Sequence, residues 1–515
     1  MYVWLGLWTV AALCEAALYS STNTPWWRSQ YWRSGAALAV GVLLAVSGLL
    51  LAIHHWVFAV GVGLFMPYRF VNASRWAKRR LQPDRLRRLC LQAFRWMISA
   101  ELLVFAGSII AVHSTVRVLL GVLGALQLLC ALVLLRVSTQ TWENATPRLP
   151  AKELQDDELP SVSVLIPARD ETTALQACLA SLTASDYPKL EILVLDDCSH
   201  GKKTPEIIRS FAQSGVRFIA GKTPPAEWVA KNYGYEQLRH ASSGEMLLFC
   251  GADTTFERFT IRRLVEVCLA RNNDMMSVLP SRRRGTHPRV ALVQTLRYYW
   301  ELCLPRRMFK RPPVLSACWL IRAATLTDFG GFNSVMQSVS PEAVFARQAV
   351  VSDTYGFVRS SADMPLYSAK TYQEQYDSMI RLRYPQLHRR LELVIATTLF
   401  ECLFFVAPFV CLTACLFLRH TSGLLVAWCA TCVAITCMYV LVAVRTRLSP
   451  LLPALLISPF VFVADIVLLH VSLLRYEFGD VVWKGRNVCL PVMRVEMNED
   501  TTDGRHSPSK PEPDV

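Results

Sequence analysis

The sequence predicts an α/β domain with a mostly parallel sheet, inserted between N-terminal and C-terminal groups of transmembrane helices. Apolar residues make up 53% of the chain and are concentrated in blocks at its two ends, whereas the region of roughly 150–390 has the composition of a soluble domain. That middle region alternates β-branched strand patterns with helical patterns, which is typical of a parallel sheet. With only 18% charged residues, the chain is too apolar for a purely soluble protein.

The N-terminal region, residues 1–140, is expected to consist mainly of membrane helices. Its apolar blocks are 2–20, 35–68, 98–113 and 115–137. A transmembrane helix needs about 20 apolar residues, so most blocks are long enough, and 35–68 accommodates one tilted helix or a tight pair. The first block has no basic segment before it and no small-residue cleavage site, so we expect a retained anchor.

The orientation is predicted from the basic segment 69–97, which is expected to be a loop between the second and third blocks. It contains Arg69, Lys78, Arg79, Arg80, Arg85, Arg87, Arg88 and Arg95. The positive-inside rule places this loop in the cytoplasm, and the next two blocks form a hairpin that returns the chain to the same side. We therefore expect a multi-pass protein of the cell (inner or plasma) membrane with a cytoplasmic middle domain. The net charge of +14 comes largely from such loops, which contact membrane lipids, so no nucleic-acid partner is predicted.

Four strand patterns are predicted in the middle domain, which we assign to residues 150–390. They lie at 161–167, 190–195, 216–220 and 245–250. Three of them end at acidic residues, which are Asp170 and Glu171, Asp196 and Asp197, and Asp253. In a parallel sheet the carboxyl ends of the strands share one edge, and ligands bind there. Carboxylates at such an edge suit a base, a ribose, and a divalent cation beside a diphosphate.

Each of these acids taken singly also fits a cap of the next helix, so this alternative stays open. The chain has no GxGxxG and no GxxxxGK[ST] sequence, which disfavours a dinucleotide or P-loop site.

Six short motifs together resemble the family 2 glycosyltransferases with the GT-A fold, particularly bacterial membrane-bound members that act on lipid or polyisoprenoid acceptors. They are Ile166-Pro-Ala-Arg-Asp-Glu171, Val194-Leu-Asp-Asp-Cys-Ser199, Trp228-Val-Ala-Lys231-Asn232, Phe249-Cys-Gly-Ala-Asp253, Phe329-Gly-Gly-Phe332 and Val482-Trp-Lys-Gly-Arg486. The motifs occur in the family's order and span about 160–335, with the last one near the C-terminus. One such motif alone is a weak signal, but the ordered set is specific.

The resemblance implies a role for particular residues. It places Pro167, Asp170, Glu171, Asp196 and Asp197 around the nucleotide of a nucleotide-sugar donor. It also places Lys231 near the donor diphosphate, where a point charge suits phosphate oxygens. Asp253 is expected to bind Mg²⁺ or Mn²⁺, which neutralises the leaving nucleoside diphosphate.

Two positions depart from the family pattern. Gly251 stands where the family has the first aspartate of its DxD motif. Where the family has its catalytic base, this chain has Glu342, which we expect to take the proton from an acceptor hydroxyl. Because Glu342 follows Ser340-Pro341, a helix N-terminal acid that interacts with the helix dipole is an equal alternative.

The acceptor motif of processive synthases is not intact either. Gln375 and Arg381 have the right residue types at a different spacing, which favours single transfers over polymer synthesis. Arg381 is expected to touch the diphosphate, and the alternative is a basic amphipathic segment at the membrane surface.

The C-terminal region is predicted to contain membrane helices over 391–475, in the apolar blocks 393–418, 422–443 and 450–474. Residues 476–515 hold the Trp483-Lys-Gly-Arg486 segment and a polar tail expected to be disordered from about Asn498. Three simple crossings put the segment outside, whereas the resemblance and Pro459 allow a broken or re-entrant segment that keeps it inside. We expect the second arrangement.

The sequence thus predicts a cell-envelope hexosyltransferase that uses a nucleotide-diphosphate sugar, a divalent cation and a membrane-associated acceptor, with inversion at the sugar. Two alternatives stay open. One is a catalytically weakened, nucleotide-sugar-binding or scaffold subunit, and the other is a processive polysaccharide synthase. A transporter is disfavoured because the apolar blocks carry few charges and show no paired repeat.

Overall fold

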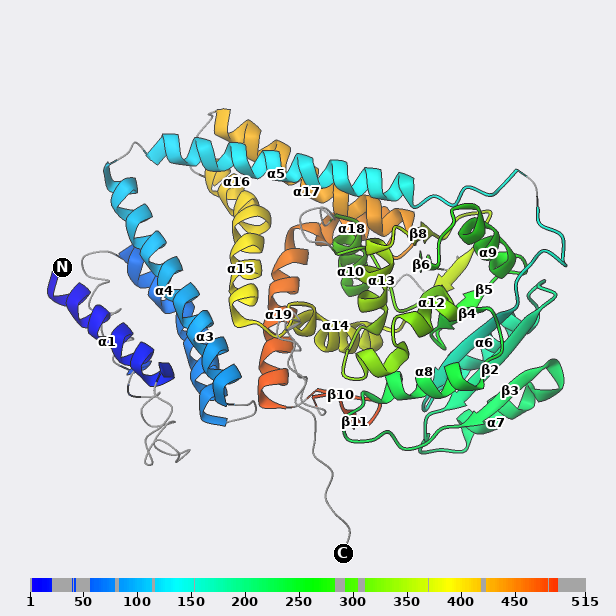
Figure 1. Cartoon of the computed structure of the whole chain (residues 1–515). Helices are drawn as coiled ribbons and strands as arrows, with labels where there is room; N and C mark the ends of the chain where they lie inside the picture. Colours follow the sequence, from blue (N-terminus) through cyan, green and yellow to red (C-terminus); the bar gives the residue numbers. More distant parts are fainter. Residues whose placement is uncertain are drawn as a thin grey trace, which may run out of the picture.

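The computed structural model describes residues 2–20, 39, 41–42, 56–78, 83–113, 116–151, 153–282, 292–303, 311–368, 370–417, 423–479 and 481–489. A sheet domain forms one end of the molecule and the long apolar helices form the other, with α10 (Leu292–Cys303) and α14 (Tyr372–Gln386) between them (Figure 1). The tail expected to be disordered lies outside the described residues.

The sheet has seven strands in the order β3-β2-β1-β4-β7-β6-β8. Their bounds are β1 Val162–Ala168, β2 Leu190–Asp196, β3 Val216–Ala220, β4 Met246–Cys250, β6 Met275–Leu279, β7 Cys318–Arg322 and β8 Tyr355–Arg359. The first four strands are parallel, as the sequence predicts, and β7 runs antiparallel between β4 and β6. The predicted α/β class with a mostly parallel sheet is therefore confirmed.

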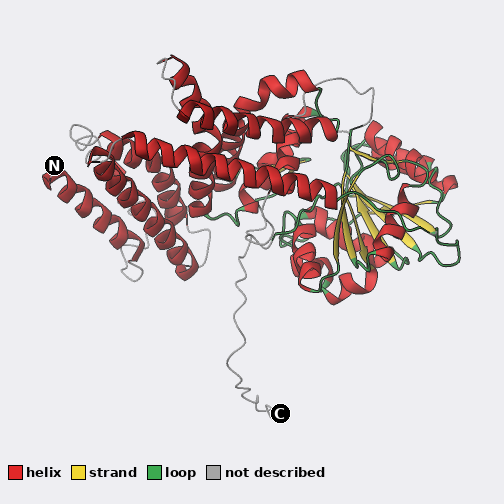
Figure 2. Ribbon diagram, turned by 90° about the horizontal axis from the view of Figure 1, so that it is seen from above, coloured by secondary structure: helices red, strands yellow, loops and turns green. Residues whose placement is uncertain are grey.

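Helices cover both faces of the sheet (Figure 2). One face packs on α6 (Thr173–Thr183), α7 (Lys203–Ser210) and α9 (Thr260–Ala270), and the other on α8 (Ala230–Ala241), α12 (Ala323–Asp328) and α13 (Pro341–Val351). The alternation along each strand sends successive side chains to opposite cores: Val164 lies in the first and Leu165 in the second. A small antiparallel pair, β5 (Thr254–Phe256) with β9 (Leu366–Ser368), lies directly after β4.

The N-terminal helices are α1 (Tyr2–Ser20), α3 (Trp56–Lys78), α4 (Pro83–His113) and α5 (Val116–Asn144). The basic segment predicted as a loop over 69–97 is instead largely helical. Apolar residues at helical spacing continue between its arginines, since Leu86, Cys90, Ala93 and Met97 are all buried on one face of α4.

Arg69 cannot be counted among the loop cations from which the orientation was predicted, because it lies within α3. It lies buried between the helices, 3.1 Å from Glu15 of α1 and 2.6 Å from Glu101 of α4. A buried arginine paired in this way says little about sidedness. Arg87, Arg88 and Arg95 remain outside such pairs in the described part of α4, and the other predicted loop cations have side chains outside the described residues.

The C-terminal helices are α15 (Leu391–Glu401), which continues through a π-helical turn (Cys402–Val406) into α16 (Ala407–Phe417), then α17 (Gly423–Arg445), α18 (Leu451–Ile457) and α19 (Val461–Phe478). A short 3-10 turn, Ser458–Phe460, separates the last two helices at Pro459. After α19, Gly479 adopts φ 75° and ends the helix, and a hairpin of β10 (Val482–Trp483) and β11 (Arg486–Asn487) follows.

Among the described residues, five helical segments are long and apolar enough to cross a membrane. They are Leu86–Gly107, Leu120–Asn144, Leu391–Phe417, Leu425–Arg445 and Leu451–Phe478. α10 packs on α5 and α17, and α14 packs on α19. These two helices therefore attach the sheet domain to the apolar helices.

Candidate active site

Two of the predicted nucleotide-binding acids join the loops that follow β1 and β2. Asp170 accepts hydrogen bonds from the backbone N–H of His200 at 2.8 Å and from its ring Nδ1 at 2.9 Å. Asp196 accepts from the Ser199 hydroxyl at 2.5 Å, and Ser199 Oγ in turn accepts from the Asp170 backbone N–H at 3.0 Å. Burial works against ionisation of Asp170, but the His200 hydrogen bonds hold the pKa of Asp170 below its usual value. Neither acid caps the next helix through its side chain.

The other two acids are paired with the hairpin that follows α19. Lys484 forms an ion pair with Glu171 and donates to the Arg169 carbonyl at 2.8 Å. Arg486 donates to both carboxylate oxygens of Asp197. Burial raises the pKa of both carboxyls, and the two cations oppose that rise.

These contacts settle where the Trp483-Lys-Gly-Arg486 segment lies. It contacts the sheet domain, so it lies on the same side of the apolar helices as that domain. That this side is the inside stays a prediction. The sequence showed that the motif is present, but only the fold shows that its cations contact acids about 300 residues earlier in the chain.

Asp253 lies just after β4, at the same edge of the sheet. Its Oδ2 accepts a hydrogen bond from Ser368 of β9 at 2.9 Å. A Cβ atom at Gly251 would stand only 2.5 Å from Asp253 Oδ1. The Asp253 carboxylate can therefore lie here only because residue 251 has no side chain.

Asp253 can supply one carboxylate ligand to a divalent cation, which needs several ligands. Within the part of the chain that the structure describes, no group of three or more His, Cys, Asp or Glu residues is arranged to hold a metal ion. The donor diphosphate and water would have to supply the remaining oxygen ligands, which is the usual arrangement for Mg²⁺ beside a phosphate substrate.

Glu342 is buried in the first turn of α13, where Pro341 occupies the start of the helix. The helix-terminus alternative is therefore geometrically correct, but it does not account for the burial. The side chain is 1% exposed, and its Oε2 has no hydrogen-bond partner among the described residues. A buried carboxylate oxygen without a partner is costly, which marks Glu342 as a residue available to a ligand.

Lys231, in the first turn of α8, is close enough to Glu342 for the two charges to interact. Its ammonium also lies 5.1 Å from the centre of the Tyr235 ring. Burial lowers the pKa of Lys231 to about 8, although Glu342 acts in the opposite direction. The structure thus brings Lys231 and Glu342 together, as a site at this edge requires.

The two arginines of α14 have different surroundings. Arg381 lies over the Trp483 ring of the hairpin, 4.7 Å from its centre, and its charge interacts with that of Glu342. Arg383 instead forms ion pairs with Glu401 of α15 and Asp465 of α19, at 2.7 and 2.6 Å. Arg381 therefore belongs to the candidate site, whereas Arg383 belongs to the packing of the helices. Pro167, which pairs with Leu195 within the sheet, lies at the end of β1.

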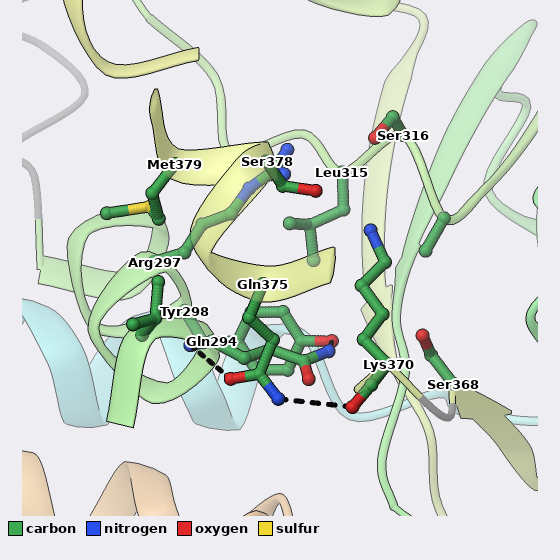
Figure 3. A pocket seen from close by; sticks show the side chains of 12 residues that line it. Gln294, Arg297, Tyr298, Leu315, Ser316, Ser368, Lys370, Gln375, Ser378 and Met379 are labelled. Carbon is green, nitrogen blue, oxygen red and sulfur yellow. Dashed lines mark hydrogen bonds between the residues drawn. The ribbon is translucent and has the colours of Figure 1, made fainter. Parts of the chain in front are cut away.

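A pocket lies next to Ser368, the hydrogen-bond partner of Asp253, between the sheet domain and helices α10 and α14 (Figure 3). Arg297 of α10 and Lys370, which precedes α14, contribute its charged groups, and the Asp253 partner Ser368 forms part of its wall. Sequence reasoning missed Arg297 and Lys370, because neither lies in a recognisable motif.

The sheet domain is similar to known proteins of one family. Residues 163–329 match the profile of "Glycosyl transferase family 2". Three curated relatives match parts of the chain. Glycosyltransferase AglE of Haloferax volcanii is 37% identical over 99 residues, which are 18% of this chain and 31% of the relative. Probable glycosyltransferase YdaM of Bacillus subtilis is 26% identical over 190 residues, 34% of this chain and 44% of the relative. An N-acetylglucosaminyltransferase of Rhizobium leguminosarum bv. viciae is 32% identical over 120 residues, 22% of this chain and 27% of the relative.

The matches thus span less than half of the length of each of these relatives. Two solved structures are similar at low identity. A mannosyltransferase of Pyrobaculum calidifontis in complex with GDP-Man and Mn²⁺ has a TM-score of 0.43 at 14% identity and covers 69% of this chain and 97% of that chain. S. aureus TarS 1-349 in complex with UDP-GlcNAc has a TM-score of 0.30 at 15% identity and covers 62% of this chain and 92% of that chain.

Proposed function

We propose that this chain, which contains a glycosyltransferase family 2 domain with a GT-A sheet, transfers a sugar from a nucleotide-diphosphate donor to a membrane-associated acceptor. One observation carries the proposal: Asp253, Glu342 and Lys231 come from three separate segments to the edge of the sheet that adjoins α10 and α14. Those helices pack on segments that are long and apolar enough to cross a membrane, which supports an acceptor in or near the bilayer.

The residues divide into donor-binding and acceptor-activating groups. In this scheme the nucleotide is held by Asp170, Glu171, Asp196 and Asp197, with Pro167 beside them, and the diphosphate by Lys231 and Arg381. Asp253 would hold Mg²⁺ or Mn²⁺, which supplies positive charge to the leaving diphosphate.

Glu342 takes the proton of the acceptor hydroxyl in this scheme. The acceptor oxygen forms a bond to the anomeric carbon while the bond from that carbon to the diphosphate breaks. The nucleoside diphosphate leaves, and the configuration at the anomeric carbon inverts. Because Glu342 is buried beside a lysine, its carboxylate stays out of water until a substrate fills the site.

The donor is proposed to carry a hexose, since one curated relative is named as an N-acetylglucosaminyltransferase. The sheet domain is proposed to lie in the cytoplasm, where nucleotide sugars are present. The exposed arginines of α4, such as Arg88 and Arg95, support that side.

A second candidate is a subunit that binds a nucleotide sugar without turnover. Two observations favour it: Gly251 removes one acidic ligand, and Lys484 with Arg486 already neutralises two of the predicted nucleotide-binding acids.

Release of nucleoside diphosphate by the purified full chain in lipid nanodiscs separates the two candidates. Nucleotide sugars are presented one at a time with Mg²⁺, with Mn²⁺ or with chelator. Metal-dependent turnover with one donor, lost in Asp253→Asn, supports the transferase. Metal-dependent binding of a donor without turnover supports the binding subunit.

A further inference from the structure

Four helices meet at one buried polar cluster, which consists of Arg383, Glu401, Asp465 and Trp300. Arg383 of α14 donates from a single nitrogen, Nη2, to Glu401 Oε1 at 2.7 Å and to Asp465 Oδ2 at 2.6 Å. Trp300 of α10 donates to the same oxygen of Asp465, also at 2.6 Å. Glu401 ends α15 and Asp465 lies in α19, so both acids belong to segments that are long and apolar enough to cross a membrane.

The cluster contains two acids and one base. Neither Glu401 nor Asp465 exposes any surface, and Arg383 is buried as well. With both acids ionised, the cluster would keep one uncompensated negative charge among apolar helices, which is costly. Tyr299 of α10 and Cys402 also interact with Glu401, but neither side chain can supply a positive charge. A single proton on one of the two acids removes the excess charge.

The hydrogen bonds of the cluster are also short of one donor. Glu401 Oε2 and Asp465 Oδ1 are buried and have no hydrogen-bond partner among the described residues. The two carboxyl groups lie within hydrogen-bond reach of each other. A proton on one carboxyl group, donated to the other, therefore gives both of these oxygens a partner. The charge and the hydrogen bonds require the same single proton.

A second cluster in the chain, around Arg69, has complete hydrogen bonds without such a proton. Arg69 donates from three nitrogens, to Glu15 Oε2 and to both carboxylate oxygens of Glu101. Tyr19 donates to the remaining oxygen, Glu15 Oε1. Two acids beside one arginine thus do not always lack a donor. The donor is missing at Arg383 because one of its nitrogens serves both acids.

The surroundings assign the proton to Glu401. Asp465 Oδ2 accepts hydrogen bonds from two N–H groups, one of them on a guanidinium, and such bonds favour the ionised form. Glu401 Oε1 accepts only one. Glu401 also stands directly before the π-helical turn Cys402–Val406, and turns of this kind occur frequently at functional sites.

We propose that Glu401 holds a buried proton and donates it to Asp465. Together with Arg383, the two acids then form a group without net charge, which fixes α10 and α14 against α15 and α19. Arg381 of α14, which lies over the Trp483 ring, is held in place by this group. The effect on Arg381 rests on the proposed function, because that function assigns Arg381 to the donor diphosphate, whereas the proton does not depend on it.

Infrared spectra of the purified full chain in detergent test the proton directly. They are recorded at about pH 8, where exposed Asp and Glu are ionised. The signal is the carbonyl stretch of a protonated carboxylic acid and its shift in D₂O. The variants are Glu401→Gln and Asp465→Asn, whose new amide N–H can replace the missing donor. Glu101→Gln is the comparison variant, because Glu101 is also a buried glutamate paired with an arginine.

We expect the parent chain to show this band and Glu401→Gln to lose it. Asp465→Asn should lose it as well, because Glu401 then becomes the only counter-charge of Arg383 and ionises. Glu101→Gln should keep it. Each of the two cluster variants should keep the thermal midpoint within about 2 °C of the parent chain. The double variant leaves Arg383 without a counter-charge, so its midpoint should fall by at least about 5 °C.

Affinity for a nucleoside diphosphate with Mg²⁺ tests the effect on Arg381. Glu401→Gln and Asp465→Asn should each bind within about twofold of the parent chain, and the double variant about tenfold more weakly. Arg383→Lys should give a smaller loss of the same kind, and it provides the measurement if the double variant does not fold. Arg69→Gln is the control, because it also leaves buried acids without their cation but acts on α1, α3 and α4. It should lower the midpoint without changing nucleotide affinity.

Three outcomes would overturn the proposal. A band that is absent from the parent chain, or that persists in Glu401→Gln, would exclude the proton on Glu401. A band that is kept in Asp465→Asn would show a lone protonated acid without the shared hydrogen bond. Unchanged nucleotide affinity in the double variant and in Arg383→Lys would exclude the effect on Arg381. Because the infrared band needs neither donor nor turnover, a chain that shows it but binds no nucleotide would contradict the proposed function and leave the proton assignment standing.

Discussion

Arg486 Nη1 donates hydrogen bonds to both carboxylate oxygens of Asp197, at 2.8 and 2.7 Å, although 289 positions separate the two residues in the chain. Asp197 lies directly after β2, and Arg486 lies in the hairpin after α19. The side chain of Asp197 is only 6% exposed, so its charge depends on this partner. The pair links the beginning of the sheet domain to the end of the helical region.

Arg486→Gln is expected to destabilise the chain by about 1–3 kcal/mol, because it leaves a buried carboxylate without its cation. The thermal midpoint in detergent should fall, and the double variant with Asp197→Asn should recover part of the loss. Arg217→Gln is the control, since its ion pair with Glu191 involves a largely exposed arginine. Additive effects of the two substitutions would show that the pair does not stabilise the fold.

Gly251→Ala is expected to raise the metal concentration needed for half-maximal turnover by about tenfold, equivalent to about 1.4 kcal/mol. The added Cβ would stand 2.5 Å from Asp253 Oδ1, so the carboxylate must leave its hydrogen bond to Ser368. Turnover is titrated with Mg²⁺ and Mn²⁺. Gly201→Ala, where nothing lies within 4 Å of the added atom, is the control. An unchanged metal requirement would mean that this position of Asp253 is not the metal-binding one.

Glu342→Gln is expected to lower kcat by about 100-fold to 10,000-fold while leaving donor affinity unchanged, because it removes a base without removing volume. Glu206→Gln is the control, since Glu206 also lies in the first turn of a helix but is exposed. Full activity in Glu342→Gln would contradict the base assignment.

Lys231 gives a prediction about pH. Burial lowers its pKa to about 8, so the ammonium is lost as the pH rises through that value, and affinity for a nucleoside diphosphate with Mg²⁺ should fall in the same range. A lysine whose pKa is lower in the folded than in the unfolded chain makes folding more favourable as the pH rises from about 8 toward 10.5, so unfolding does not explain the loss. Lys231→Arg stays charged and should flatten the profile. Identical profiles for the two chains would contradict the role of Lys231.

Periodicity and turn residues were enough to predict the strands and helices of the first half of the sheet domain. β1, β2, β3 and β4 each begin within one residue of the predicted position, because each is a short apolar run ended by polar residues. The basic segment 69–97 was predicted wrongly, because its arginines obscured an apolar stripe that continues through α4.

The acids at the strand ends could be predicted to lie at one edge because the sheet brings the ends of parallel strands together. Arg297 and Lys370 could not, because their position depends on how α10 and the segment before α14 pack against the domain. The partners of Glu171 and Asp197 could not be predicted from the sequence either, since a pairing across about 300 residues leaves no periodic signal.

The hairpin after α19 has a consequence for how the protein is made. Glu171 and Asp197 form ion pairs with Lys484 and Arg486. These two cations leave the ribosome only after the five long apolar helical segments of the described residues have been synthesised. These two ion pairs therefore form last, after α19 has been synthesised and the hairpin has reached the sheet domain. An excised fragment of 150–390 would keep the strands but lack the hairpin, so Glu171 and Asp197 would have no cationic partners from it. Truncation before Gly479 would remove the same two partners.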